Sequence, residues 1–285
     1  MKNVAGSGGK WLDVSAERLP GWIASFAVRH GLSGTETAQR ADLAVAVADD
    51  HVSFTAQDGA VAQCYPPFPP AGGITALLEE VTPPARLDDP AVPAAGLDDP
   101  AAIAEALAAH ARKPRTVGVL LVRLGGYAAG VFTGYPPALG PAKVGSRLVH
   151  GRSAAGGWSQ HRFARRREKQ ANEALSAAAD AAVLIFGGAA GAGKGGVTVR
   201  STSQKRATDG GAAVGGRPAP RATRLDAVVL GGDRRAVADL RDDPRLGPYF
   251  GLATERFLTV PDPKRAVLLE AAKQFTAVRI WLTEP

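Results

Sequence analysis

The sequence contains a single cysteine, Cys64, which excludes an internal disulfide and fits a reducing compartment. Its five histidines show no metal-ligand spacing, which argues against a structural zinc site. No stretch approaches the ~20 apolar residues that a membrane-spanning helix needs. Residues 1–10 lack the apolar segment of a secretory signal. We therefore expect a cytoplasmic protein that has no metal, no cofactor and no membrane partner.

Familiar catalytic signatures are also missing. The sequence has no Gly-x-Ser-x-Gly elbow and no Ser/His/Asp triad that can be placed. The run from Gly188 to Lys194 is similar to a phosphate-binding loop, but Gly195 stands where a magnesium-binding Ser or Thr is required. Four pairs of aspartates could suggest a two-metal nuclease. Three of these pairs stand beside a proline, where aspartate usually makes local hydrogen bonds.

The composition indicates a folded, basic protein. Hydrophobic residues make up 45% of the chain, which is enough for a buried core and argues against general disorder. The net charge is +7, and only nine of the 34 basic residues are lysines. A basic balance of this kind favours a polyanionic partner such as a nucleic acid.

Changes in pattern along the chain predict three parts. Residues 1–10 are expected to form a disordered leader, and residues 11–114 a small α+β region with a proline-rich connector. Residues 115–285 are expected to form a mixed α/β domain. Within this domain, residues 187–222 are rich in Gly, Ala, Ser and Arg and are expected to be a low-complexity insert.

Periodicity and turn signals predict the elements of both regions. In the first region we expect helices at 11–30, 75–81 and 101–111 and strands at 41–47, 52–55 and 61–65. Asp99 is expected to cap the third of these helices. In the second region we expect strands at 117–124, 127–133, 146–150, 181–186, 225–230 and 257–260, and a short strand or turn at 278–282. Helices are expected at 161–182, 234–242 and 263–275.

The most informative stretch is a glycine-rich loop followed by a cationic helix. Residues 151–159 are small and flexible, and Ser159 is a plausible start for the helix beyond. Five cations follow within the first turns of that helix: Arg162, Arg165, Arg166, Arg167 and Lys169. Guanidinium groups bind phosphate well because their planar fork can donate two hydrogen bonds at once. The alternative is an ordinary solvated helix face.

From Val117 onward, the order of features resembles the catalytic middle domain of class 1 eukaryotic and archaeal peptide-chain release factors. The resemblance rests on Gly156-Gly157-Trp158-Ser159-Gln160, on the cationic helix after it, and on Gly231-Gly232-Asp233. It extends to the actinobacterial VLRF-type proteins, which are similar to hydrolases that free nascent chains from stalled ribosomes. Release factors place a glutamine directly after two glycines, whereas here Trp158 and Ser159 intervene.

The resemblance implies a fold and a function. The fold is a release-factor-like mixed sheet with flanking helices, preceded by the small α+β region. The activity is hydrolysis of the ester between a peptide and the 3′ end of tRNA, by a monomer that acts on the large ribosomal subunit and its peptidyl-tRNA. The implied catalytic residues are Gln160, Gly156 and Gly157. The implied RNA-binding residues are Arg152, Trp158, Arg162, Arg165, Arg166, Arg167 and Lys169.

Two other functions remain open at this stage. One is a nuclease that cuts near the tRNA 3′ end, and the other is a ribosome- or RNA-binding factor without catalysis. Residues 1–114 carry no motif that indicates their role.

Overall fold

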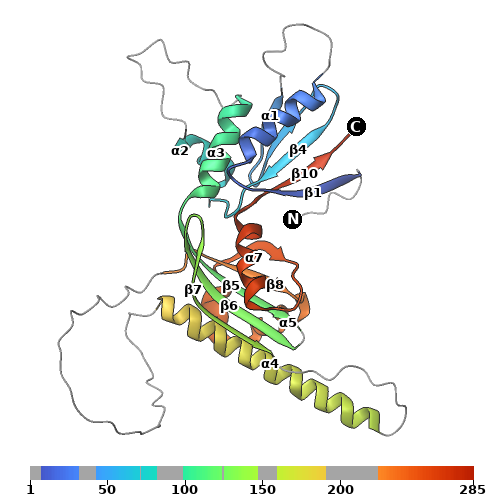
Figure 1. Ribbon diagram of the computed structural model, residues 1–285, viewed down its shortest axis with the longest axis vertical. Coiled ribbons are helices and arrows are strands. Elements are labelled where there is room, and N and C mark those ends of the chain that lie inside the picture. The colour runs from blue at the N-terminus through green and yellow to red at the C-terminus, as the bar shows by residue number, and fades with distance from the viewer. Residues whose placement is uncertain are drawn as a thin grey trace, which may run out of the picture.

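The structure is a computed structural model of the chain. It describes residues 8–31, 43–70, 72–81, 99–123, 125–146, 159–190 and 224–285. For residues 80, 81, 159–171, 189 and 190 it describes the backbone only. The described residues form two five-stranded sheets with helices packed against them (Figure 1).

The first sheet is antiparallel throughout and has the strand order β1-β10-β4-β3-β2. Its strands are β1 (Gly9–Val14), β2 (Ala44–Val47), β3 (Val52–Thr55), β4 (Val61–Tyr65) and β10 (Val278–Thr283). Three helices pack on one face: α1 (Leu19–His30), α2 (Gly73–Val81) and α3 (Pro100–Arg112). Buried and less buried residues alternate along β3, β4 and β10, as expected for strands with one face on a core.

The second sheet is mixed and has the order β7-β6-β5-β8-β9. Its strands are β5 (Arg115–Arg123), β6 (Gly126–Gly134), β7 (Ala138–Ser146), β8 (Ala227–Gly232) and β9 (Ala253–Leu258). β5, β6 and β7 are antiparallel neighbours, whereas β5, β8 and β9 run parallel. β5 lies in the centre and is buried over seven consecutive residues, because helices cover both faces of the sheet.

Helices occupy both faces of this second sheet. α4 (Ser159–Ala190) lies on one face together with α5 (Arg234–Asp239), and α7 (Arg265–Thr276) lies on the other. Two 3₁₀ turns, η1 (Leu240–Asp242) and η2 (Pro244–Leu246), and the short helix α6 (Gly247–Phe250) lead from α5 to β9. The mixed α/β class predicted from the sequence is confirmed.

The two sheets meet at a junction that several polar contacts cross. The Arg256 guanidinium of β9 donates to the Asp13 carboxylate of β1 at 2.7 Å and to the Ala277 carbonyl at 2.6 Å. The Tyr135 hydroxyl donates to the Glu17 carboxylate, which lowers the pKa of that carboxyl. Because Arg256 is largely buried, its charge needs these partners to remain inside the junction.

Several predicted elements are confirmed at their places. β3 and β4 have the predicted bounds, and α3 begins after Asp99, whose side chain accepts from the Ala101 N–H at 3.0 Å. Asp243 caps η2 in the same way, by accepting from the Arg245 N–H. These two aspartates thus serve local hydrogen bonding, as predicted for the aspartate pairs beside prolines.

Other predicted elements are wrong. Residues 11–14 are a strand rather than the start of a helix, and Gly9 and Lys10 of the predicted leader belong to the same strand. The strand predicted at 181–186 is helical, since α4 continues to Ala190 and so includes the first residues of the predicted insert. β7 ends at Ser146, and the other residues of the strand predicted at 146–150 lie outside the described residues. The rest of the insert, residues 191–222, lies outside the described residues.

The last strand, β10, lies in the first sheet, although it follows the helices of the second sheet along the chain. β10 leaves the second region and pairs with β1 and β4 in the first sheet. The carboxyl-terminal strand therefore completes the sheet that the amino-terminal strand borders (Figure 1). Val278, Ile280 and Leu282 of β10 fill part of the first core.

Candidate functional site

Helix α4 carries the predicted site at its beginning. It has 32 residues, and its later half packs on the second sheet. The buried residues there are mostly small: Ala178, Ala179, Ala181, Ala182, Ile185 and Phe186. The earlier half extends past the edge of the sheet (Figure 1). The packed half thus anchors a projecting helix start.

The structure places only some of the predicted site residues. Gln160 is the second residue of α4, so its backbone is helical. The five predicted cations occupy the first three turns of the same helix, and positions 162, 166 and 169 share one side of it by helical spacing. Arg152, Gly156, Gly157 and Trp158 lie outside the described residues. The structure brings Gln160 and the five cations together on one helix.

The charge distribution of α4 is unusual for a helix start. The first N–H groups of a helix have no partner within it and carry a partial positive charge, which acidic side chains normally offset. The first turn of α4 has no acidic residue, and the cations follow immediately. Such a helix end favours an anionic partner, because phosphate oxygens satisfy both the free N–H groups and the cations.

The Gly231-Gly232-Asp233 corner has a clear structural role. Gly232 has a φ of +103°, and a Cβ added there would lie 2.1 Å from the Val122 carbonyl oxygen of the neighbouring strand. The Asp233 N–H donates to that oxygen at 2.8 Å, and the Asp233 side chain caps α5 through the Arg235 N–H. Glycine at 232 is therefore required where β8 turns away from β5.

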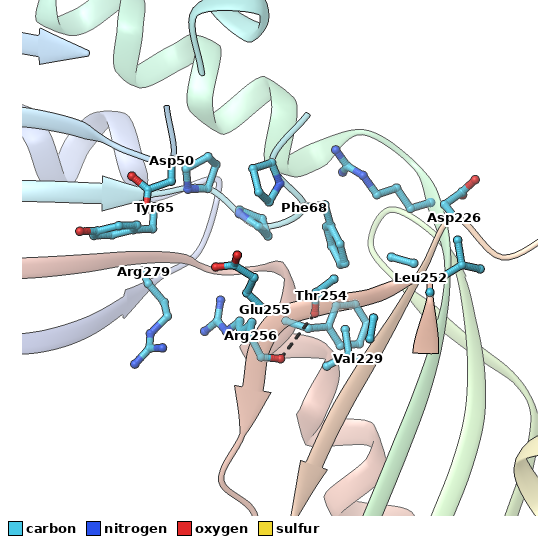
Figure 2. Close-up of a pocket in the computed structure, with 18 residues that line it drawn as sticks. Asp50, Tyr65, Phe68, Asp226, Val229, Leu252, Thr254, Glu255, Arg256 and Arg279 are labelled. Atoms are coloured by element: carbon cyan, nitrogen blue, oxygen red, sulfur yellow. Dashed lines mark hydrogen bonds between the residues drawn. The ribbon is translucent and has the colours of Figure 1, made fainter. Parts of the chain in front are cut away.

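A cavity of about 630 Å³ lies at the junction of the two sheets (Figure 2). It is lined by the segment after β4, by β9 and by residues near the start of β8, with Arg115, Arg256 and Arg279 among them. Burial lowers the pKa of the Arg115 guanidinium, and the Asp226 carboxylate opposes that shift. The size is within the range of small-ligand pockets. Sequence reasoning missed this cavity, because its walls come from distant segments.

The described part of the chain offers no candidate for a metal centre. No group of three or more His, Cys, Asp or Glu side chains among those residues could hold a metal ion. No helix within the described ranges is long and apolar enough to cross a membrane.

The cationic start of α4 and the glycine corner after β8 are two of the features on which the resemblance to release factors rests. A family model described as the Actinobacteria/chloroflexi VLRF1 release factor matches residues 115–281. The chain belongs to this family, and it is thus a translation protein of the kind that works with the ribosome. No curated protein is similar enough to the chain to match it.

The match begins with β5, at residue 115. It ends within β10, so it covers the second sheet, its helices and most of the strand that returns to the first sheet. Residues 1–114 lie outside the match. The family match therefore covers the second sheet. The role of the first sheet has to be inferred from its own residues.

Proposed function

We propose that the protein is a peptidyl-tRNA hydrolase that frees nascent chains from stalled ribosomal complexes. The observation that carries the proposal is the family match over residues 115–281, which spans the glycine loop and the cationic helix α4. The division into a small α+β region and a release-factor-like domain with an insert is part of this proposal. The protein acts without a metal or cofactor, as a monomer in the cytoplasm.

The proposed reaction is attack of water on the carbonyl carbon of the ester. The peptide leaves as a carboxylic acid, and the 3′ oxygen of the terminal tRNA ribose takes up a proton. A glutamine side chain is not a useful acid or base near neutral pH, so Gln160 acts by positioning the water through its amide. A backbone N–H of the loop stabilises the developing oxyanion. Gly156 and Gly157 give the loop the shape it needs in a crowded catalytic centre.

The cationic helix supplies binding in this account. Arg162, Arg165, Arg166, Arg167 and Lys169 contact phosphates of ribosomal RNA or of the tRNA acceptor end, together with Arg152. Trp158 stacks on a nucleotide beside the loop. The N–H groups at the start of α4 add to the same attraction. Binding therefore depends on the helix, and the chemical step depends on the loop.

The proposal is tested by incubating stalled nascent-chain complexes of the large subunit with the protein and examining peptide and tRNA separately. Freed peptide with an intact tRNA end supports ester hydrolysis. A shortened tRNA identifies a nuclease instead. Binding without a change in either product identifies a factor without catalysis. Both of the latter results overturn the proposal.

Replacing Arg165, Arg166 and Arg167 together by Glu is expected to weaken ribosome or tRNA binding strongly. Each phosphate contact that is lost means that fewer counterions are released on binding. The plot of log affinity against log salt concentration should therefore become less steep, by about 2 to 3 in slope. A binding titration at several salt concentrations measures both quantities.

The matched control for this variant reverses three exposed charges elsewhere: Arg18, Arg29 and Lys273 to Glu. It changes the net charge by the same amount and should leave most of the affinity. Equal losses in the two variants would show that total charge matters and that the start of α4 has no special role.

A further inference from the structure

One face of the first sheet carries no helix in the described part of the chain. Helices α1, α2 and α3 cover the other face, where the aliphatic residues of the strands are buried. By strand register, Trp11, Trp281 and Gln63 stand side by side on the open face, and Asp13, Arg279 and Tyr65 form the next row. We call these six residues the aromatic face.

The Trp11 ring contacts two other aromatic rings on this face. The Trp11 ring lies 5.1 Å from the Trp281 ring and 5.4 Å from the Tyr65 ring, measured between centroids. Tyr65 belongs to β4, two strands from β1, so the Trp11 ring extends across β10. Trp11 is nevertheless 42% exposed. An exposed tryptophan on a sheet, held in place by neighbouring rings, is a preformed stacking surface.

Gly9 leaves room for the Trp281 ring. A Cβ at Gly9 would lie 2.6 Å from two ring atoms of Trp281, so the indole packs directly over the glycine backbone. The ring is therefore fixed before any ligand arrives, and little conformational entropy is lost on binding.

An arginine lies against the rings of the aromatic face. The Arg279 guanidinium lies 4.3 Å from the centre of the Trp11 ring. Arg279 and the buried Arg256 share one carboxylate oxygen of Asp13, at 3.8 Å and 2.7 Å. Two guanidinium groups thus share one carboxylate oxygen, and Arg279 lies at the longer distance from it. The Arg279 guanidinium is therefore the group of this face that can pair with a phosphate, with the Asp50 carboxylate nearby at Tyr65.

The remaining side chains of the open face are polar or small. The other outward positions of the five strands hold Gly9, Ala44, Ala46, Ser53, Thr55, Val61 and Thr283. The described strands therefore place no leucine, isoleucine or methionine on this face. Aromatic rings, an arginine and hydrogen-bonding side chains on a sheet are the groups that recognise unpaired bases.

We propose that the aromatic face binds single-stranded RNA, with bases stacked on Trp11, Trp281 and Tyr65 and a phosphate near Arg279. The choice of RNA as the occupant also rests on the proposed function at the ribosome, whereas the binding itself is separate from ester hydrolysis. Tyr65 and Arg279 line the junction cavity as well (Figure 2), so bound RNA would continue towards the second sheet. The first sheet is then an RNA-binding module joined to the release-factor-like region.

The test is fluorescence anisotropy of a labelled oligouridine titrated with the full-length chain. Trp11→Leu keeps an apolar side chain on β1 but removes the aromatic ring, and it should weaken binding about 5- to 100-fold. Trp11→Phe, which restores a ring, should recover most of the affinity. Val28→Ala, at an exposed position of α1 on the far side of the sheet, should bind as the unchanged protein does. Duplex RNA of the same length should bind more weakly than the single strand.

The same titrations are repeated in the Arg165, Arg166 and Arg167 to Glu background. Loss of binding in that background together with normal binding by Trp11→Leu would overturn the proposal, because α4 alone would then hold the RNA. If Trp11→Leu does not fold, ultraviolet cross-linking of oligouridine to the unchanged protein decides. Cross-links in peptides containing Trp11, Tyr65 or Trp281 support the proposal, and cross-links confined to other peptides contradict it.

Oligouridine carries no peptidyl ester, so these results are independent of hydrolysis. A protein that releases peptide but ignores oligouridine would contradict the aromatic-face proposal alone. One that binds oligouridine through Trp11 but leaves peptidyl-tRNA intact would contradict the hydrolase proposal alone.

Discussion

Gln160→Ala is expected to reduce peptide release about one hundredfold or more while ribosome binding persists. Loss of one well-placed transition-state contact has an effect of this size. Gln160 is the second residue of α4, in the half of the helix that extends past the sheet, so the fold should tolerate alanine there. Single-turnover release with saturating protein separates the chemical step from binding.

Gln170→Ala is the matched control for this prediction. Gln170 belongs to the same helix, beyond the last of the five cations. Its replacement removes the same side chain from the same element and should leave release unchanged. If Gln160→Ala hydrolyses peptidyl-tRNA at the unchanged rate, the mechanism proposed for the loop is wrong.

Gly232→Ala is expected to destabilise the protein by about 3 kcal/mol or more, through a clash and an unfavourable backbone conformation together. The added methyl group would lie 2.1 Å from the Val122 carbonyl oxygen, and φ is +103°. β8 lies beside the central strand β5, so the chain cannot shift there without breaking the parallel pairing. Urea unfolding of the full-length chain measures the change.

The control for Gly232→Ala is Gly21→Ala. Gly21 lies in α1 with no atom near its missing side chain. Alanine is about 0.5–1 kcal/mol better than glycine within a helix, so this variant should be more stable. An equally mild effect at both positions would contradict the structural role of the Gly231-Gly232-Asp233 corner.

The sequence predicted most elements whose signals are local. Alternation over 52–55 and 61–65 is sufficient for β3 and β4, and Asp99-Pro100 marks the start of α3. The run Ala181–Phe186 was misread as a strand, because a short apolar segment fits a buried helix equally well. β7 contains Pro141, two glycines and two alanines, and only its pairing with β6 at the sheet edge explains it.

Features that depend on distant segments escaped prediction. β1 and β10 are the first and last described strands of the chain, and no local pattern indicates that they pair. The aromatic face has the same origin, since Trp11, Tyr65 and Trp281 meet only after that pairing. In the candidate site, the start of α4 was predicted from Ser159 and the cations after it. The roles of Arg152, Gly156, Gly157 and Trp158 remain predictions.

The central claim is that water attacks the acyl carbon of peptidyl-tRNA, and one measurement tests it directly. Peptide release is carried out in water enriched in oxygen-18, and the released peptide is analysed by mass spectrometry. The account predicts a peptide whose carboxyl group has gained one heavy oxygen, together with tRNA that keeps its terminal adenosine. A released peptide that still carries a nucleotide would contradict the account.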